Sequence, residues 1–125
     1  MVPVLLSIRP EHAEKIFNGS KEFEYRRKFT SKEVNLAYVY ASSPTQSVIG
    51  YIEIQRVIKM KPGDLWELTK VRSGLTEFQY NQYFINCDIA YAIEIKKAEL
   101  FKHPNKLSKY CLERPPQSYQ FLYDI

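Results

Sequence analysis

A densely charged run with aromatic side chains among the charges occupies residues 21–29, KEFEYRRKF. Lys21, Glu24 and Arg26 stand out in it, because their types suit recognition of a polar ligand. Lysine and arginine can hold a phosphate or a carbonyl oxygen, and a carboxylate can accept hydrogen bonds from the amino or imino groups of a base. Taken alone, the spacing of Glu24 and Arg26 favours a surface ion pair. The alternative is a site that binds a charged ligand, and three further features of the sequence support it.

Alternation along this run predicts a β-strand with one apolar and one polar face. Glu24 and Arg26 are two residues apart, so their side chains lie next to each other on the polar face. Arg26 and Arg27 are consecutive and cannot point in the same direction, so one of them must face inward or be paired. A buried arginine needs a carboxylate or a phosphate, and Glu24 is the carboxylate at hand.

Lys21 begins this strand at the end of a loop, where binding residues concentrate. Arg9 ends the preceding strand, and antiparallel pairing of the two strands would bring Arg9 to the same rim. The same side chains could perform acid–base chemistry if Lys21 were buried, because burial lowers the pKa of a lysine. The residues alone leave binding and catalysis both open.

The hydrophobic pattern indicates the elements that must position these residues. An apolar run predicts a strand over residues 2–9, and Pro10 predicts the first turn of a helix that ends before Gly19. Gly50 is a candidate for a bulge or a tight bend in one of the later strands. Alternating or apolar runs predict those later strands over 34–41, 47–60 and 87–101.

Two further helices and a tail complete the expected fold. Asp64 predicts a helix over residues 65–72 that stops at Gly74, and Thr76 predicts the N-cap of an aromatic helix. The Pro-rich tail after residue 112 is expected to lie across the sheet. Because short links favour antiparallel pairing of consecutive strands, we expect an α+β fold in a single domain over residues 1–125. Its core would be a closed or nearly closed, mostly antiparallel β-barrel with short helices packed around it.

Composition narrows the class of partner. The chain has 18 Lys and Arg against 14 Asp and Glu, which is compatible with an RNA or nucleotide partner. Cys87 and Cys111 are too far apart for a zinc site, and neither His12 nor His103 lies at metal-ligand spacing. We therefore expect no metal and no cofactor. No apolar run reaches the length of a membrane span and no signal peptide is evident, so we expect a cytoplasmic protein without membrane association.

The segment LLSIRPEHAEKIFNGSKEFEYRRKF, residues 5–29, resembles the opening of the ASCH domain, a branch of the PUA-like superfamily. The pattern of that family is an apolar strand ending in a Ser-Ile-basic-Pro unit, a short helix, and then Gly-x-Lys-x-x-Glu-x-Arg. Here these units are Ser7-Ile8-Arg9-Pro10 and the stretch from Gly19 to Arg26. The resemblance continues through the later strands and helices to the terminal PPQSYQFL, and so covers nearly the whole chain.

The resemblance implies a PUA-like β-barrel with helices over its openings and a cleft beside the first helix. Most members are inferred to bind RNA or a nucleotide there. By the motif match, Lys21, Glu24 and Arg26 would line this cleft, with Arg9 and Ser42 as further counterparts. The preferred prediction is an RNA- or modified-nucleotide-binding module, in which Lys21 and Arg26 hold a phosphate or a base carbonyl and Glu24 accepts from a base edge.

Two other functions remain open. The first is a small hydrolase that acts on a modified nucleoside or on RNA, an amidohydrolase or a ribonuclease, with Lys21 as the reactive or polarising group. Some small ASCH proteins are amidohydrolases with a lysine, a threonine three residues later, and a glutamate just before the later helix. This chain has Glu24 at the threonine position and no carboxylate near Ser73, since Glu67 and Glu77 lie to either side. The second is a regulatory protein-interaction domain whose cleft is vestigial.

Overall fold

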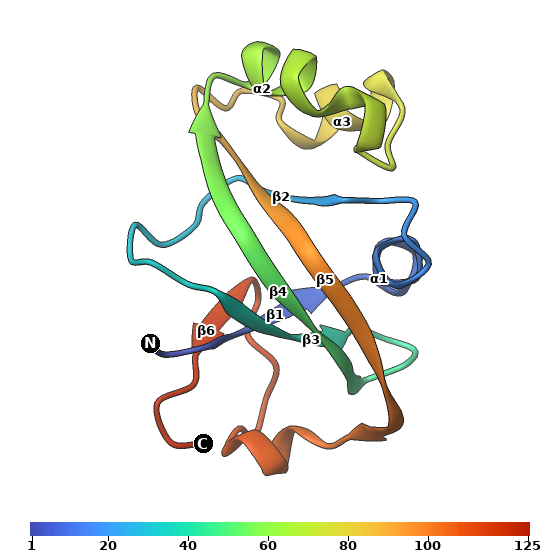
Figure 1. Ribbon diagram of the computed structural model, residues 1–125, viewed down its shortest axis with the longest axis vertical. Coiled ribbons are helices and arrows are strands. Elements are labelled where there is room, and N and C mark those ends of the chain that lie inside the picture. The colour runs from blue at the N-terminus through green and yellow to red at the C-terminus, as the bar shows by residue number, and fades with distance from the viewer.

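Six strands form one mixed sheet, and three α-helices and two short 3-10 segments pack against it in the computed structural model, which describes residues 1–125 (Figure 1). The strands are β1 (Val4–Ile8), β2 (Phe23–Arg26), β3 (Leu36–Ala41), β4 (Ser47–Met60), β5 (Ala90–Asn105) and β6 (Tyr119–Phe121). The helical elements are α1 (Pro10–Phe17), α2 (Pro62–Thr69), η1 (Lys70–Arg72), α3 (Glu77–Tyr83) and η2 (Leu107–Tyr110).

Local signals place most helix ends where the sequence predicts them. Pro10 opens α1 in the first turn, where its missing N–H costs nothing. Gly19 follows the end of α1 with φ +86°, a conformation that only glycine adopts cheaply. Thr76 caps α3, because its hydroxyl accepts from the backbone N–H of Gln79 while the side chain of Gln79 accepts from the N–H of Thr76. These three predictions are confirmed.

The predicted start of α2 was wrong. The helix begins at Pro62 and not after Asp64, and Asp64 lies inside its first turn. The physical reason is the same as for α1. The ring of proline fixes φ at a helical value, and proline is tolerated at the first helical position. Asp64 still favours this helix end through its charge near the positive end of the helix dipole.

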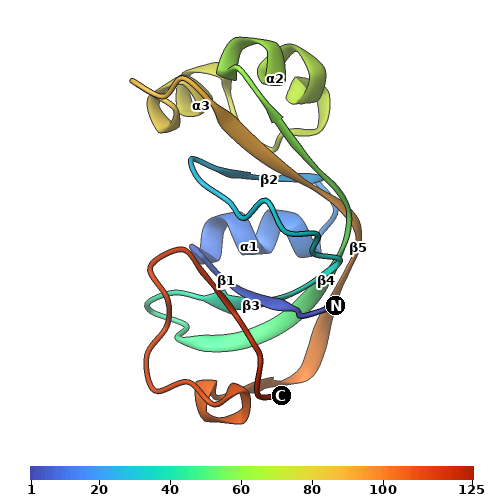
Figure 2. The same cartoon turned by 90° about the vertical axis from the view of Figure 1, so that its left-hand side faces the viewer.

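The sheet has the order β2-β5-β4-β3-β1-β6, and its two edges, β2 and β6, do not pair with each other. It is therefore a curled half-barrel, open along one seam, and Figure 2 shows β4 and β5 curving around the side of the molecule. The prediction that consecutive strands pair antiparallel holds for β3 with β4 and for β4 with β5. It fails for the other consecutive strands, because β2 pairs with β5 and β1 pairs with β6 and, in parallel, with β3. The long crossover from Ile8 to Leu36, which contains α1 and β2, returns the chain in the same direction.

The curvature of the long strands is set by irregular pairing. Register shifts occur in the pairing of β4 with β5 next to Gly50, as the predicted bend requires. A side chain at Gly50 would place its Cβ 2.9 Å from the ring of Phe17 and 2.4 Å from the carbonyl oxygen of Glu99. Only glycine fits here, and the close contact brings α1 against the concave side of the sheet.

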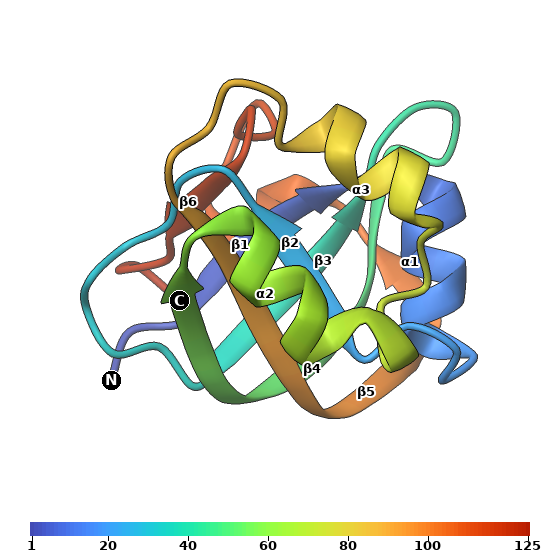
Figure 3. The ribbon, with the colours of Figure 1, turned by 90° about the horizontal axis from the view of Figure 1, so that it is seen from above.

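α2 and α3 lie over one end of the sheet, above β2 and the beginning of β5 (Figure 3). Tyr80 of α3 and Phe84 at the end of this helix are buried, as expected for an aromatic stripe that packs into the core. At the other end of the sheet the tail forms β6 against β1, and Leu122 is buried. None of the helices combines the length and the apolar character needed to cross a membrane.

Candidate functional site

A cleft of about 870 Å³ lies at the open seam of the half-barrel. One wall is the end of β1, the opposite wall is β2 and the residues after it, and the tail segment 115–118 forms a third side. Five of its lining residues are Lys or Arg and one is a carboxylate, Glu24. The cations are Arg9, Lys21, Arg26, Arg27 and Lys28. This cleft therefore favours an anionic ligand.

The floor of the cleft is a buried cluster of three charged side chains. Lys21, Glu24 and Arg26 have exposed fractions of 2%, 7% and 6%. The Nη2 of Arg26 donates to Oε2 of Glu24 at 2.9 Å, and the Nζ of Lys21 lies 3.7 Å from Oε1 of the same carboxylate. The interpretation as an ordinary surface ion pair is therefore wrong. The strand β2 is buried on its polar face as well as on its apolar face.

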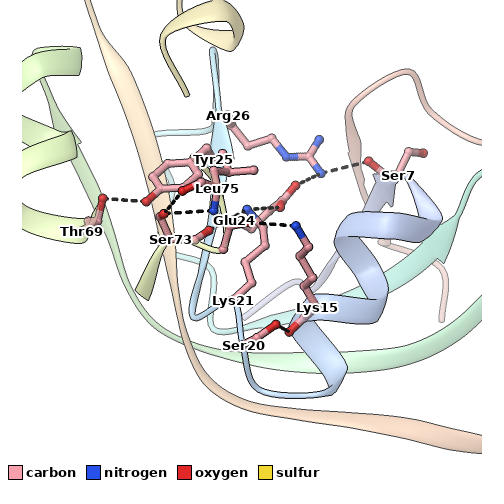
Figure 4. A network of polar contacts seen from close by, with 11 residues as sticks. Ser7, Lys15, Ser20, Lys21, Glu24, Tyr25, Arg26, Thr69, Ser73 and Leu75 are labelled. Atoms are coloured by element: carbon pink, nitrogen blue, oxygen red, sulfur yellow. Dashed lines mark hydrogen bonds and ion pairs between the residues drawn. The ribbon is translucent and has the colours of Figure 1, made fainter. Parts of the chain in front are cut away.

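Arg26 bridges the seam between the two edges of the sheet. Its Nη2 also donates to the carbonyl oxygen of Ser7 at 3.0 Å, and its Nη1 donates to both the carbonyl oxygen and the Oγ of Ser118 at 3.1 Å. Figure 4 shows Arg26 reaching from β2 toward Ser7, with Glu24 between Arg26 and Lys21. The Nε of Arg26 is buried without a partner. A second bond, from Ser7 Oγ to the carbonyl of Pro116 at 2.6 Å, fastens the tail to β1.

Lys21 lies in a nearly closed environment. Its Nζ is 3.5 Å from the carbonyl oxygen of Ser73 and 4.8 Å from the centre of the Tyr25 ring. Burial lowers the pKa of Lys21 below its ordinary value, and the carboxylate of Glu24 partly opposes this change. Gly74 has φ +70°, and a Cβ there would lie 2.7 Å from the Cβ of Lys21. The absence of a side chain at Gly74 thus leaves the space that the lysine stem occupies.

The apolar face of β2 is fixed from the helical side. The hydroxyl of Tyr25 lies 2.6 Å from Oγ1 of Thr69, and Thr69 donates its own hydrogen to the carbonyl of Leu65 at 2.8 Å. Tyr25 is therefore the donor in its bond to Thr69. Burial raises the pKa of Tyr25 to about 12, so its hydroxyl stays protonated at neutral pH. This bond ties β2, and with it Glu24 and Arg26, to α2.

The rim of the cleft carries exposed cations. Arg27 points outward, as expected if Arg26 points inward, and its guanidinium lies 4.2 Å from the centre of the Tyr83 ring. The Nε of Arg27 also donates to the carbonyl of Tyr83 at 2.7 Å. Arg9 and Ser42 line the cleft too. Arg9 does not arrive there by pairing of β1 with β2, as the sequence suggested, but because the end of β1 borders the seam.

Several lining residues were not predicted as site residues. Ser7 and Ser118 hold Arg26, and nothing in their spacing signals this, because they are 111 positions apart in the sequence. His12 lines the cleft from α1, and its Nδ1 is buried without a partner. Burial, and then the charge of Lys21, lower the pKa of His12 below its usual value. No group of three or more metal-ligating side chains occurs in the molecule.

The curled mixed sheet, the helices over its end and the cleft beside α1 define an α+β fold of the PUA-like class. The family model named ASCH domain matches residues 6–99. The chain therefore belongs to the ASCH domain family.

Similar proteins support this assignment along nearly the whole chain. An ASCH domain-containing ribonuclease of Zymomonas mobilis is 28% identical over 122 residues, which cover 94% of this chain and 82% of that protein. The crystal structure of ASCH from Zymomonas mobilis superposes with a TM-score of 0.88 at 27% identity, covering 98% of this chain and 88% of the other.

A second relative is longer than this chain. The large ribosomal subunit protein uL22 of Ureaplasma parvum serovar 3 is 26% identical over 120 residues, or 95% of this chain. The chain spans 39% of the length of that relative.

Proposed function

We propose that this chain binds single-stranded RNA or a modified nucleotide in the cleft at the seam of the half-barrel. The observation that carries the proposal is the arrangement of five cationic side chains around one fixed, buried carboxylate. Cations bind phosphates and release counterions, whereas a fixed carboxylate accepts hydrogen bonds from the amino and imino groups of a base edge. The Zymomonas mobilis relative, named as a ribonuclease, supports RNA as the ligand.

The geometry suggests a different role for each of these side chains. Arg26 uses four of its donors on Glu24, Ser7 and Ser118, so we assign it to orienting the carboxylate and holding the wall. Lys21 holds the other oxygen of Glu24 from the floor, so phosphate binding falls to Arg9 and Lys28 on the exposed rim. Glu24 is already held in place by two cations, which suits it to accept hydrogen bonds from the base.

Fluorescence anisotropy of a labelled single-stranded RNA of about 12 nucleotides tests the proposal, since single-strand sites span about 4–16 nucleotides. We expect affinity to fall steeply between about 50 and 200 mM salt. Arg9→Glu and Lys28→Glu change exposed rim residues and should weaken binding without affecting the fold. Lys96→Glu changes the net charge equally but lies outside the cleft, so it should bind like the parent chain. A flat salt response, or equal loss in all three variants, would reject the cleft as the site.

RNA cleavage is the second candidate, and the relative named as a ribonuclease favours it. In such a reaction the 2′ oxygen gives up its proton and bonds to the adjacent phosphorus. The bond from phosphorus to the 5′ oxygen breaks, and the 5′ oxygen takes a proton from water. His12 lines the cleft and burial lowers its pKa, so its neutral imidazole could take the proton from the hydroxyl. Lys21 could stabilise the charge that develops on the phosphate oxygens.

Single-turnover assays with end-labelled RNA and excess protein test this second candidate. We expect cleavage to be lost in His12→Gln and Lys21→Ala, whereas RNA binding persists in His12→Gln. Parent protein that binds RNA and leaves it intact would leave only the binding function. Amidohydrolase chemistry has less support from the geometry, because neither Glu67 nor Glu77 lines the cleft and Lys21 faces the carbonyl of Ser73.

A further inference from the structure

A second hollow of about 590 Å³ lies at the end of β5 that is remote from α2 and α3. In Figure 1 this end is where β5 runs into η2, at the bottom of the view. We call this hollow the aromatic–basic groove. Its lining includes three aromatic residues, Tyr38, Phe101 and Tyr110, and three basic ones, Lys102, His103 and Lys109. It shares no lining residue with the cleft.

The aromatic rings of the groove converge from three separate elements. The ring centre of Tyr38, on β3, lies 4.9 Å from that of Tyr110 on η2 and 6.4 Å from that of Phe101 on β5. Tyr38 and Phe101 are only partly buried, whereas Tyr110 is 5% exposed. Half-exposed rings held in place by a buried one form a surface on which a flat, apolar ring can stack.

The basic side chains around these rings have no acidic partner. Lys102, His103 and Lys109 are exposed, and none of them takes part in an ion pair of the molecule. Among the side chains that line the groove there is no carboxylate. The groove therefore offers a polyanion positive charge that the protein does not already use.

A pair of polar side chains adds hydrogen-bonding groups. The Nδ2 of Asn105 donates to the hydroxyl of Tyr110 at 3.0 Å, which leaves the O–H of Tyr110 and the Oδ1 of Asn105 without a partner among the protein's hydrogen bonds. Burial raises the pKa of Tyr110, so its hydroxyl remains a donor at neutral pH. One donor and one acceptor beside the rings match the mixed edge of a nucleic-acid base.

We infer that the aromatic–basic groove is a second binding site for single-stranded RNA, in which a base stacks on Phe101 and Tyr38 and neighbouring phosphates lie against Lys102 and Lys109. Stacking platforms flanked by cations are the usual means of holding single strands. A duplex would leave the rings unused, because its bases are already stacked. An acidic peptide could also use the cations, and competition with poly-glutamate distinguishes it from RNA. The inference rests on the proposed function only in its choice of RNA as the ligand.

The strand β5 connects the two sites. Tyr91 of β5 pairs with Arg26 beside the cleft, and Phe101 lies ten residues further along the same strand. At roughly 3.3 Å per residue this is a path of about 33 Å at most. A single RNA strand of sufficient length can therefore contact both sites, whereas an oligonucleotide of about 4 nucleotides can occupy only one.

The test measures binding of labelled single-stranded RNAs of about 12 and about 4 nucleotides to the full chain by anisotropy. Phe101→Ala should weaken binding of the longer RNA about tenfold, the expected loss for one base stacked on an aromatic ring. Phe101→Leu keeps apolar packing and should lose nearly as much. Tyr123→Ala removes an aromatic ring that is 65% exposed and does not line the groove, so it should bind like the parent.

A charge series and a crosslink locate the contact. Lys102→Glu should weaken the longer RNA more than the matched change Lys96→Glu on the same strand. RNA carrying 4-thiouridine should crosslink under ultraviolet light to peptides of the 101–110 segment, as mapped by mass spectrometry.

The outcomes separate this inference from the proposed function. If Phe101→Ala and Phe101→Leu bind the longer RNA like the parent while Arg9→Glu does not, the groove is not an RNA site and the cleft proposal stands. If Phe101→Ala loses affinity and the cleft variants do not, the groove stands and the cleft proposal fails. If a poly-glutamate peptide competes as well as RNA does and no crosslink maps to residues 101–110, the groove is a site for acidic protein segments and the inference is overturned.

Discussion

The cleft and the aromatic–basic groove present positive charge in opposite ways. On the cleft floor, Lys21 and Arg26 are buried and committed to Glu24 and to backbone carbonyls. In the groove, Lys102 and Lys109 are exposed and unpaired. A buried charge costs free energy of desolvation and must be held in one geometry, whereas an exposed lysine keeps its hydration and its freedom until a ligand arrives. The cleft floor is therefore suited to selecting ligands by shape and hydrogen-bond geometry, whereas the groove is suited to attracting anionic ligands by charge.

This comparison has a practical consequence for mutagenesis. Changes on the cleft floor should alter stability and binding together, because each partner there supports another buried charge. Changes in the groove should alter binding alone.

Glu24→Gln should be the most damaging substitution. It removes the only carboxylate that faces Lys21 and Arg26 on the cleft floor, and breaking a buried ion pair on one side costs about 3–5 kcal/mol of unfolding free energy. Urea denaturation measures the change. The control is Glu22→Gln two residues away, because Glu22 pairs with the exposed Arg72. Equal midpoints for the two variants would contradict the view that the floor is structurally committed.

Gly74→Ala should follow in size. The backbone there has φ +70°, and the new Cβ would meet the stem of Lys21, so we expect a loss of about 1–3 kcal/mol. RNA binding should weaken as well, since the lysine must shift. Gly63→Ala is the matched control, because no atom lies within 4 Å of its Cβ position. If thermal unfolding shifts equally in both variants, the contact with Lys21 does not matter.

Tyr25→Phe should cost about 1 kcal/mol at neutral pH, the net contribution of one hydrogen bond. The pKa of Tyr25 is about 12 in the folded chain against 10.0 ordinarily. The unfolded chain therefore loses this proton first, and the parent loses stability as pH rises from about 10 to 12. The variant lacks this loss, so its deficit should shrink over that range in urea titrations. A deficit that stays constant from pH 7 to 11.5 would show that Tyr25 titrates normally.

Lys102→Ala should have the smallest effect on the fold. Its side chain is exposed and unpaired, so the unfolding free energy should stay within about 0.5 kcal/mol of the parent. Lys21→Ala, in contrast, leaves Glu24 with one partner fewer and should be clearly destabilised. Calorimetric unfolding of the two variants side by side checks this. Similar losses in both would remove the distinction between the buried and the exposed cations.

Much of the cleft floor could be predicted because its contacts join residues that are close together in the sequence. Glu24 and Arg26 are two residues apart on a strand, so their side chains lie next to each other. Arg26 and Arg27 are consecutive, so one of the two must point inward. Arg26 is indeed the inward one and Glu24 its partner. The left-handed Gly19 and the cap at Thr76 are equally local, since each depends on the conformation of a few neighbouring residues.

The parts that could not be predicted depend on distant contacts. Arg26 donates to the backbone carbonyls of Ser7 and Ser118, and carbonyl groups carry no sequence signature. The parallel pairing of β1 with β3 follows from β2 leaving to pair with β5, a choice that hydrophobic alternation does not encode. The groove joins residues from β3, β5 and η2, and no local spacing in the sequence links these three segments.

The tail segment 115–118 has a consequence for divergence among relatives. It forms a wall of the cleft, yet it lies beyond residues 6–99, which the family model matches. Chains that keep the shared motif but carry different last residues would have the same charged cleft floor, but the wall formed by the tail would have a different shape. Ligand choice can thus change during evolution by exchange of a short C-terminal segment, while the residues that define the family stay constant.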